Sequence, residues 1–269
     1  MKKLIFLITI AFLAGAAHAK IEAVLGDVPL KENKNLVGLP SAPSDEVIIS
    51  RRQYVISYNK ERRSPNWVAW KVDARSLGSA DRTDKFEQDK ELQEYLSQTP
   101  QALPAVTPDE YRGSCFDRGH QAPSADRTSS VASNEATFAM SNMLPQTPYL
   151  NRSLWQQLEQ HTRDLVSQGN TVYVVAGPVY DQNYGAIGPN QDIPVPSKLF
   201  KVVIVKDGDK FRTFSVVMPN VLKTGEEPTN KESLCLDSAA SSEGQNIEWQ
   251  RYRSNLKEIQ EVTGLKLAR

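Results

Sequence analysis

The sequence has little of several features that would narrow its class. Only two of its 269 residues are cysteines and three are histidines, and basic and acidic residues balance at 32 each. So few cysteines exclude a disulfide scaffold and a cysteine-rich zinc module. Without net charge there is no global basic field for nucleic acid, so any phosphate-binding surface must be local. The 39% hydrophobic and 24% charged content excludes a disordered chain, a coiled coil and a multi-span membrane protein.

One hydrophobic run lies at the N-terminus and is too short to span a membrane. Met1-Lys2-Lys3 gives a positive start, Leu4 to Ala14 is apolar, and Ala17-His18-Ala19 offers small residues to a signal peptidase. A membrane-spanning helix needs ~20 apolar residues. The pattern predicts a secretory signal peptide over residues 1–19, cleaved after Ala19; an uncleaved anchor is the alternative. We expect an exported protein, periplasmic or secreted, without a membrane segment after cleavage.

Export would place Cys115 and Cys235 where thiols oxidise. A bond between them would close a long loop and contribute up to ~4.7 kcal/mol in the chain-entropy model. The alternative is two buried free thiols. On the compartment alone, we expect the disulfide.

Secondary-structure patterns predict one mixed domain. Residues 20–50 place Pro29, Pro40 and Pro43 among polar residues, which predicts an N-terminal arm with little regular structure. Residues 51–269 contain β-rich and amphipathic runs without a linker or repeat, which predicts a single α+β domain with a central, mainly antiparallel sheet. The expected strands are Arg51–Asn59, Trp67–Val72, Thr171–Ala176, Lys198–Val205 and Phe211–Val217, and the expected helices are Asp89–Ser97, Asn134–Met143 with Ser133 as N-cap, Asn151–Gln168 and Trp249–Val262.

The segment richest in reactive side chains surrounds His120 and reads CFDRGHQAPSADRT from Cys115 to Thr128. Histidine accepts a proton near neutral pH, and guanidinium groups bind anions such as phosphate. One histidine among two aspartates and two arginines is therefore a candidate general base beside an anion-binding site. The alternative is a histidine in a polar surface loop with its hydrogen bonds satisfied.

A second group lies on the helix expected at Asn151–Gln168. Asn151, Trp155, Glu159 and Arg163 are four residues apart, so each step advances ~40° and they form one slanting stripe. We expect Trp155 to pack inward. Mg²⁺ keeps several waters and takes few protein oxygens, so Asn151 with Glu159 would suit it. The alternative is a Glu159–Arg163 surface pair, which contributes only ~0.2–0.5 kcal/mol.

Together these segments resemble the DNA/RNA non-specific endonuclease family, the secreted ββα-metal nucleases, and within it the cyanobacterial sugar-non-specific branch. The family's Asp-Arg-Gly-His signature stands at Asp117–His120. The resemblance runs roughly from Arg51 to Leu267. It includes Asn66–Trp70, Leu77 to Arg82, the run TFAMSNMLPQTP from Thr137 to Pro148, and then Asn151, Trp155, Leu158-Glu159 and Arg163.

The resemblance implies the ββα-metal (His-Me finger) nuclease fold and hydrolysis of phosphodiester bonds in DNA and RNA, leaving 5′-phosphate ends. His120 is similar to the general base, Asn151 to the direct protein ligand of one hydrated Mg²⁺, and Glu159 to the carboxylate that holds its waters. Mn²⁺ is the alternative metal. The other implied site residues are Asn142, a supporting polar residue, and Arg163, Arg82 and Arg118 near the phosphate.

Two features depart from the family's pattern. Some members have a further asparagine where Phe138 stands, and the stretch between Arg82 and Tyr111 is longer here. Two other functions remain open, namely a catalytically inactive nucleic-acid-binding module and a small-nucleotide phosphodiesterase. His161 lies off the Asn151 stripe, and we expect it to be partly exposed and not a metal ligand. The residues indicate neither an inhibitor protein nor an oligomeric state.

Overall fold

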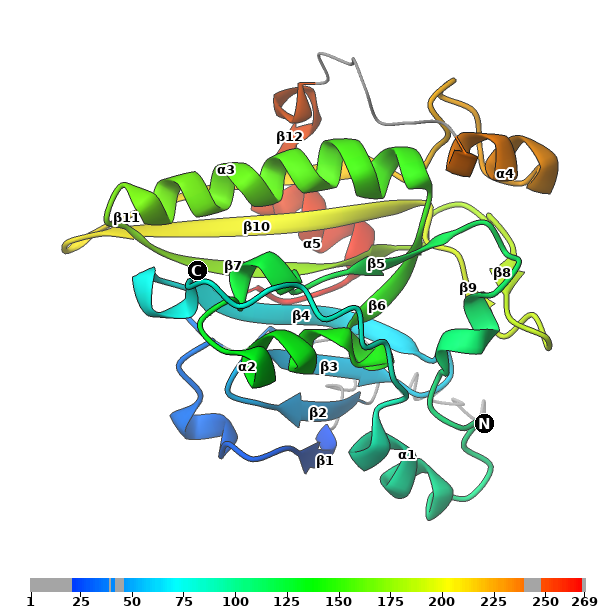
Figure 1. Ribbon diagram of the computed structural model, residues 1–269, viewed down its shortest axis with the longest axis horizontal. Coiled ribbons are helices and arrows are strands. Elements are labelled where there is room, and N and C mark those ends of the chain that lie inside the picture. Colours follow the sequence, from blue (N-terminus) through cyan, green and yellow to red (C-terminus); the bar gives the residue numbers. More distant parts are fainter. Residues whose placement is uncertain (1–20, 39, 42–45, 240–247, 268–269) are drawn as a thin grey trace, which may run out of the picture.

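The computed structural model describes residues 21–38, 40–41, 46–239 and 248–267. Its main sheet consists of β1 (Ile21–Leu25), β2 (Glu46–Ser50), β3 (Val55–Asn59), β4 (Ser64–Val72), β7 (Thr171–Val179), β10 (Lys198–Asp207), β11 (Lys210–Pro219) and β12 (Arg253–Ser254). These eight strands are ordered β1-β2-β3-β4-β7-β10-β11-β12 (Figure 1). The β1–β2 pair is parallel, and the other neighbours are antiparallel.

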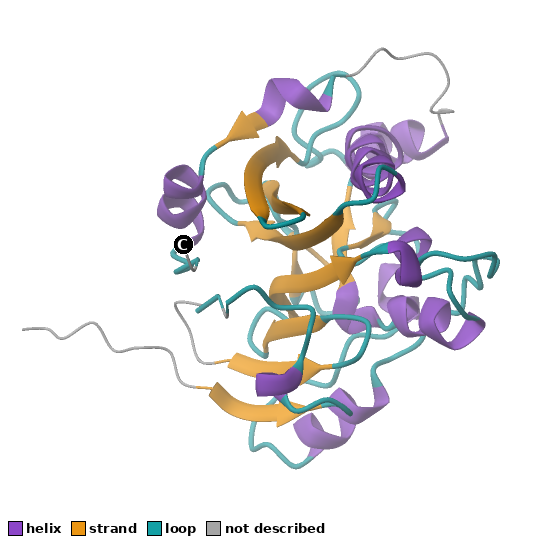
Figure 2. Ribbon diagram, turned by 90° about the vertical axis from the view of Figure 1, so that its left-hand side faces the viewer, coloured by secondary structure: helices purple, strands orange, loops and turns teal. Residues whose placement is uncertain are grey.

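Helices lie on both faces of this sheet (Figure 2). They are α1 (Lys90–Ser97), α2 (Val131–Glu135), α3 (Gln156–Ser167), α4 (Lys231–Ala239) and α5 (Leu256–Thr263). Two small antiparallel pairs complete the strands: β5 (Asp117–His120) with β6 (Met143–Gln146), and β8 (Ala186–Ile187) with β9 (Ile193–Pro194). Short 3₁₀ turns occur at Leu30–Glu32, Ala74–Ser76, Pro108–Tyr111, Ser124–Asp126, Ala136–Phe138, Met140–Asn142 and Trp249–Tyr252.

The two faces of β4 show how the sheet separates two hydrophobic cores. Side chains alternate along a strand, so Trp70 points to the core beneath α3 and Trp67 points to the core beneath α5. Leu158 on α3 closes the first core, and Ile259 on α5 closes the second. The α+β class and the mainly antiparallel sheet predicted from the sequence are confirmed.

The prediction of little regular structure in residues 20–50 is wrong. This segment supplies β1 and β2 to the edge of the main sheet. Val47, Ile48 and Ile49 are 0% exposed, so apolar burial against β3 determines the conformation there. Pro29 and Pro40 lie outside the two strands, and Pro43 lies outside the described residues.

The prediction of one helix over Asn134–Met143 is also wrong. α2 begins earlier, because Ser130 rather than Ser133 is the N-cap, and it ends after five residues. The chain then makes two 3₁₀ turns and enters β6. Asn142 Nδ2 donates to the Thr137 carbonyl at 2.9 Å, and this contact takes an acceptor that a continuing helix would use for its own backbone.

The final predicted helix, Trp249–Val262, is interrupted. It starts as a 3₁₀ turn, pairs briefly with β11 as β12, and resumes as α5. The side chain of Asn255 caps α5 by accepting from the Glu258 backbone N–H at 3.0 Å. An N-cap at this position starts a new helix.

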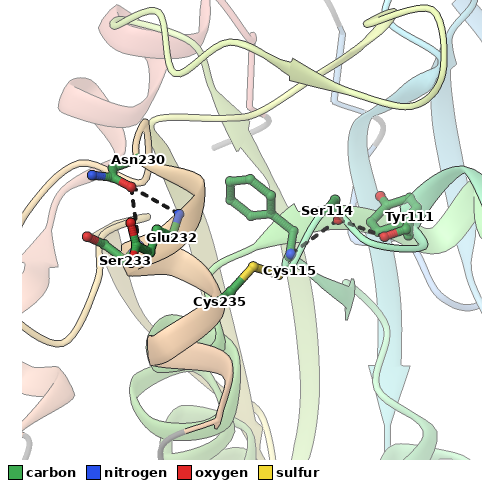
Figure 3. The surroundings of a disulfide bond; sticks show 8 residues. Tyr111, Ser114, Cys115, Asn230, Glu232, Ser233 and Cys235 are labelled. Atoms are coloured by element: carbon green, nitrogen blue, oxygen red, sulfur yellow. Dashed lines mark hydrogen bonds between the residues drawn. A yellow bond between two sulfur atoms is a disulfide. The ribbon is translucent and has the colours of Figure 1, made fainter.

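Cys115 and Cys235 form the predicted disulfide, which joins the segment before β5 to α4 (Figure 3). On one side, Ser114 Oγ accepts from the Phe116 backbone N–H at 3.2 Å. On the other side, Asn230 Oδ1 caps the start of α4. Among the described residues, no helix is long and apolar enough to cross a bilayer; the predicted signal peptide lies outside them.

Replacing both cysteines, C115A/C235A, should lower the free energy of unfolding by about 2–4 kcal/mol. The unfolded chain would regain the freedom of a loop spanning a sequence separation of 120 residues. Urea unfolding measures this difference, and reductant should destabilise the wild type but leave the double variant unchanged. Equal stability of the oxidised wild type and the double variant would contradict the expected contribution.

Candidate active site

Two consecutive segments of the chain build the candidate site. β5 ends at His120, and its partner β6 leads into a π-helical turn over Leu150–Trp155 that continues directly as α3. π-helical turns are rare and occur frequently at functional sites. The turn carries Asn151, and α3 carries Glu159 and Arg163. The helix predicted over this stretch is therefore present, with a wider first turn.

Trp155 joins the helical segment to the strand that carries the histidine. Its side chain packs inward as predicted and is 1% exposed, and its indole Nε1 donates to the backbone oxygen of His120 at 3.2 Å. β5 also packs closely against its partner strand β6, because a Cβ at Gly119 would lie 2.3 Å from Cδ of Gln146. A larger residue at this position would displace the side chain of Gln146.

The imidazole of His120 is enclosed by aromatic rings. The ring centroids of Phe86 and Phe138 lie 5.5 and 4.8 Å from it, and the residue is 8% exposed. Burial, followed by the charges of Arg82 and Arg118, lowers the pKa of His120 to about 3. Its buried Nε2 has no hydrogen-bond partner among the described residues. His120 is therefore a neutral imidazole at neutral pH, the form that can accept a proton.

Two arginines lie over the aromatic rings that enclose His120. The guanidinium carbon of Arg118 lies 3.9 Å from the ring centroid of Phe86, and that of Arg82 lies 4.9 Å from the ring centroid of Phe138. Arg82 also donates to Ser124 Oγ at 2.9 Å. Phe138, where some relatives have asparagine, thus contacts both His120 and Arg82 as an aromatic wall.

The side chain of Asn151 is oriented by Asp117. Asn151 Nδ2 donates to Asp117 Oδ2 at 2.8 Å. An ionised carboxylate only accepts hydrogen bonds, so the amide nitrogen faces it and Oδ1 remains for another ligand. Arg152 holds the same carboxylate with two hydrogen bonds, of 2.9 and 2.7 Å. The sequence did not indicate this role of Asp117 or Arg152.

Glu159 lies beside a buried lysine that the sequence analysis missed. Lys201 on β10 is 1% exposed, and its Nζ lies 3.8 Å from Glu159 Oε1 and 3.9 Å from the ring centroid of Trp155. Burial raises the pKa of Glu159 to about 7, against the effect of Lys201, and Asp126 adds to the rise. Burial also lowers the pKa of Lys201 to about 8. A lysine within an apolar strand is the one signal the sequence offered.

Arg163 is anchored by a buried aspartate. Its Nη1 donates to Asp126 Oδ1 at 3.1 Å, and the indole of Trp70 donates to Oδ2 at 2.9 Å. Asp126 is 1% exposed. The predicted Glu159–Arg163 stripe therefore faces the protein body, and the alternative of an open surface pair is wrong.

Asn142 is part of the scaffold beneath the site. It is 0% exposed. Its Oδ1 accepts from the Ala122 backbone N–H, and its Nδ2 donates to the carbonyls of Ala122 and Thr137, at 2.9 to 3.0 Å. Its backbone oxygen accepts from the Gln121 backbone N–H at 3.0 Å. It fixes the chain that follows His120.

The structure thus brings the predicted residues into one neighbourhood. The charge of Arg82 affects both His120 and Glu159. It contributes to the lowered pKa of His120 and opposes the raised pKa of Glu159. His161 is half-buried as predicted and lies against the rings of Phe214 and Trp249.

The available oxygen ligands suit a hydrated cation. The described residues contain no group of three or more His, Cys, Asp or Glu that would form an all-protein cage. Oδ1 of Asn151 accepts no hydrogen bond from the described residues, and Glu159 is a nearly buried carboxylate. A hard cation that keeps its waters needs no more than such a pair.

The imidazole of His120 should stay neutral well below pH 6.5, because its pKa is lowered to about 3. An NMR titration of its ring in the folded protein should show no protonation between pH 7 and about 5, whereas in urea the ring should titrate normally. Since only the unfolded chain takes up this proton, stability should fall as the pH decreases below 6.5. Protonation of folded His120 near pH 6.5 would contradict the enclosed site.

Known proteins resemble this chain over most of its length. The family model for DNA/RNA non-specific endonucleases matches residues 34–269. A nuclease from Nostoc sp. is 36% identical over 237 residues, which cover 85% of this chain and 78% of the relative. Nuclease C1 from Cunninghamella echinulata var. echinulata is 32% identical, with coverage of 71% of this chain and 78% of the relative.

A solved structure supports the same assignment. The crystal structure of the EndoG/EndoGI complex matches with a TM-score of 0.64 and 27% identity, covering 82% of this chain and 84% of that chain. This likeness confirms the predicted ββα-metal nuclease fold. The chain is a nuclease, and it belongs to the DNA/RNA non-specific endonuclease family.

Proposed function

We propose that this nuclease hydrolyses phosphodiester bonds of both DNA and RNA, with His120 as the general base. The observation that carries the proposal is the imidazole of His120, which is packed by two aromatic rings and which burial and two arginine charges keep neutral. This ring takes a proton from the attacking water. Burial, helped by the charges of Arg82 and Arg118, keeps the ring neutral, and the two arginines present positive charge to the phosphate.

The metal in this proposal is Mg²⁺, with Mn²⁺ as an alternative. Oδ1 of Asn151 would hold it directly, and Glu159 would hold it through water. When bound, the cation neutralises charge on the phosphoryl group and the leaving oxygen. Asp117 supports this assignment because it fixes which way the amide of Asn151 faces. A bound cation favours the ionised form of Glu159, whose pKa is otherwise raised to about 7.

The remaining charged residues bind and orient the substrate. Arg163 is held by Asp126, so its guanidinium is already positioned for a phosphate oxygen. Most of the affinity comes from phosphate contacts, which carry no sequence information. We therefore propose weak sequence preference, 5′-phosphate products, and activity that decreases with salt.

The replacement His120→Ala should reduce cleavage of plasmid DNA and bulk RNA by roughly 10²–10⁴-fold, as expected for loss of a general base. EDTA should abolish cleavage of both polymers by the wild type. His161→Ala is the matched control, because it removes a histidine that contacts Phe214 and Trp249 instead of the site. We expect that variant to stay active.

Other results of this experiment would change the assignment. Cleavage that survives His120→Ala would contradict the role of the base. Binding without cleavage at any divalent metal would favour an inactive nucleic-acid-binding module. Faster turnover of dinucleotides than of polymers would favour a small-nucleotide phosphodiesterase.

We also propose that the protein is exported, periplasmic or secreted, after removal of residues 1–19. The charged start, apolar run and small residues at Ala17 and Ala19 support this. Amino-terminal sequencing of the exported protein should begin at Lys20. Recovery of intact Met1 on protein retained at the membrane would contradict the proposal.

A further inference from the structure

Arg152 connects the site to a distant part of the chain. It is adjacent to Asn151 in the π-helical turn, and its guanidinium grips both carboxylate oxygens of Asp117. Its remaining nitrogen, Nη1, donates to the backbone oxygen of Ser238 on α4 at 3.0 Å. One side chain therefore joins the start of β5 to the C-terminal part of α4.

α4 supports the π-helical turn at a second point. Asp237 Oδ2 accepts from the Tyr149 backbone N–H at 3.1 Å, immediately before the turn. Asp237 Oδ1 accepts from the Lys223 backbone N–H at 3.0 Å. Leu234 is the one buried residue within α4, whereas Leu236 is 68% exposed. Apolar packing thus contributes little to holding α4 in place.

The disulfide attaches α4 covalently to the segment before β5. Cys235 lies one helical turn before Ser238 on α4, and its partner Cys115 lies two residues before Asp117. The covalent link and the Ser238–Arg152–Asp117 contacts therefore join the same two segments at adjacent points. Loss of the disulfide would leave α4 attached mainly by hydrogen bonds near the surface.

We propose that Arg152 is a positioning residue for Asn151, and that the Cys115–Cys235 disulfide keeps Arg152 in place by holding α4. The inference rests on the proposed role of Asn151 as the metal ligand. Without Arg152 the carboxylate of Asp117 can rotate, because the two hydrogen bonds from Arg152 fix its plane. When that plane is lost, the amide of Asn151 no longer has a defined direction. Removing such supporting partners typically lowers metal affinity or activity 10–100-fold.

Arg152→Met should raise the dissociation constant for Mn²⁺ alone by about tenfold or more, measured from the EPR signal of the free ion. At saturating Mn²⁺, kcat on DNA should return close to the wild-type value, because Arg152 orients the ligand without touching the substrate. A merely structural role would lower kcat at every metal concentration. The matched control is Arg52→Met, which removes an exposed arginine paired with Asp27 and should leave the dissociation constant unchanged.

Asn151→Ala separates the two levels of the proposal. If this variant binds Mn²⁺ as well as the wild type, the proposed metal ligand itself is wrong. If Asn151→Ala loses binding while Arg152→Met binds normally, the ligand stands and the positioning role of Arg152 is overturned. Circular dichroism confirms that each variant is folded before its affinity is compared.

The disulfide is tested by combining variants. C115A/C235A should weaken Mn²⁺ binding severalfold in the wild-type background and have little further effect when Arg152 is already methionine. Such non-additivity shows that both changes act through one network. Independent, multiplicative effects on the dissociation constant, or no effect of C115A/C235A, would overturn the inference that the disulfide acts through Arg152.

Discussion

The site depends on one buried hydrogen bond, from the indole of Trp155 to the backbone of His120. It joins the strand that carries His120, the proposed base, to the helical segment that carries Asn151 and Glu159, the proposed metal-binding residues. Trp155 also forms the surface on which Lys201 rests, beneath Glu159. Because the indole is fully packed, the separation of the two halves is set by the hydrophobic core instead of by flexible surface contacts.

Charge compensation then determines what each polar group can do. Asp117 and Asp126 are committed to Asn151, Arg152, Arg163 and Trp70, so each of these is oriented before substrate arrives. His120 has aromatic and cationic neighbours and stays neutral. The carboxylate of Glu159 accepts no hydrogen bond from the described residues and lies 3.8 Å from Lys201, which suits it to hold water. A chain with no net charge thereby concentrates cations at one location.

The sequence identified those features that local spacing encodes. The signature at Asp117–His120 and the four-residue spacing from Asn151 to Arg163 pointed to the candidate site only together with the resemblance to the nuclease family, because spacing alone left a surface ion pair open. Lys201 and the contact of Phe86 with the ring of His120 were missed because they join segments far apart in the chain. The strands β1 and β2 at one side of the sheet were missed for a related reason, since the pairing of β2 with β3 and of β1 with β2 outweighs the irregular local pattern. The broken helix after α2 depends on the side chain of Asn142, which no helical periodicity reveals.

We propose that a hydrated cation binds at Asn151 while His120 remains free to accept a proton. Anomalous diffraction from crystals soaked in Mn²⁺ tests it directly. The account predicts one peak bonded to Oδ1 of Asn151 at about 2.0–2.2 Å, as for small hard cations, with the carboxylate of Glu159 beyond a layer of water. A peak bonded to Nε2 of His120, or no peak at Asn151, would contradict it.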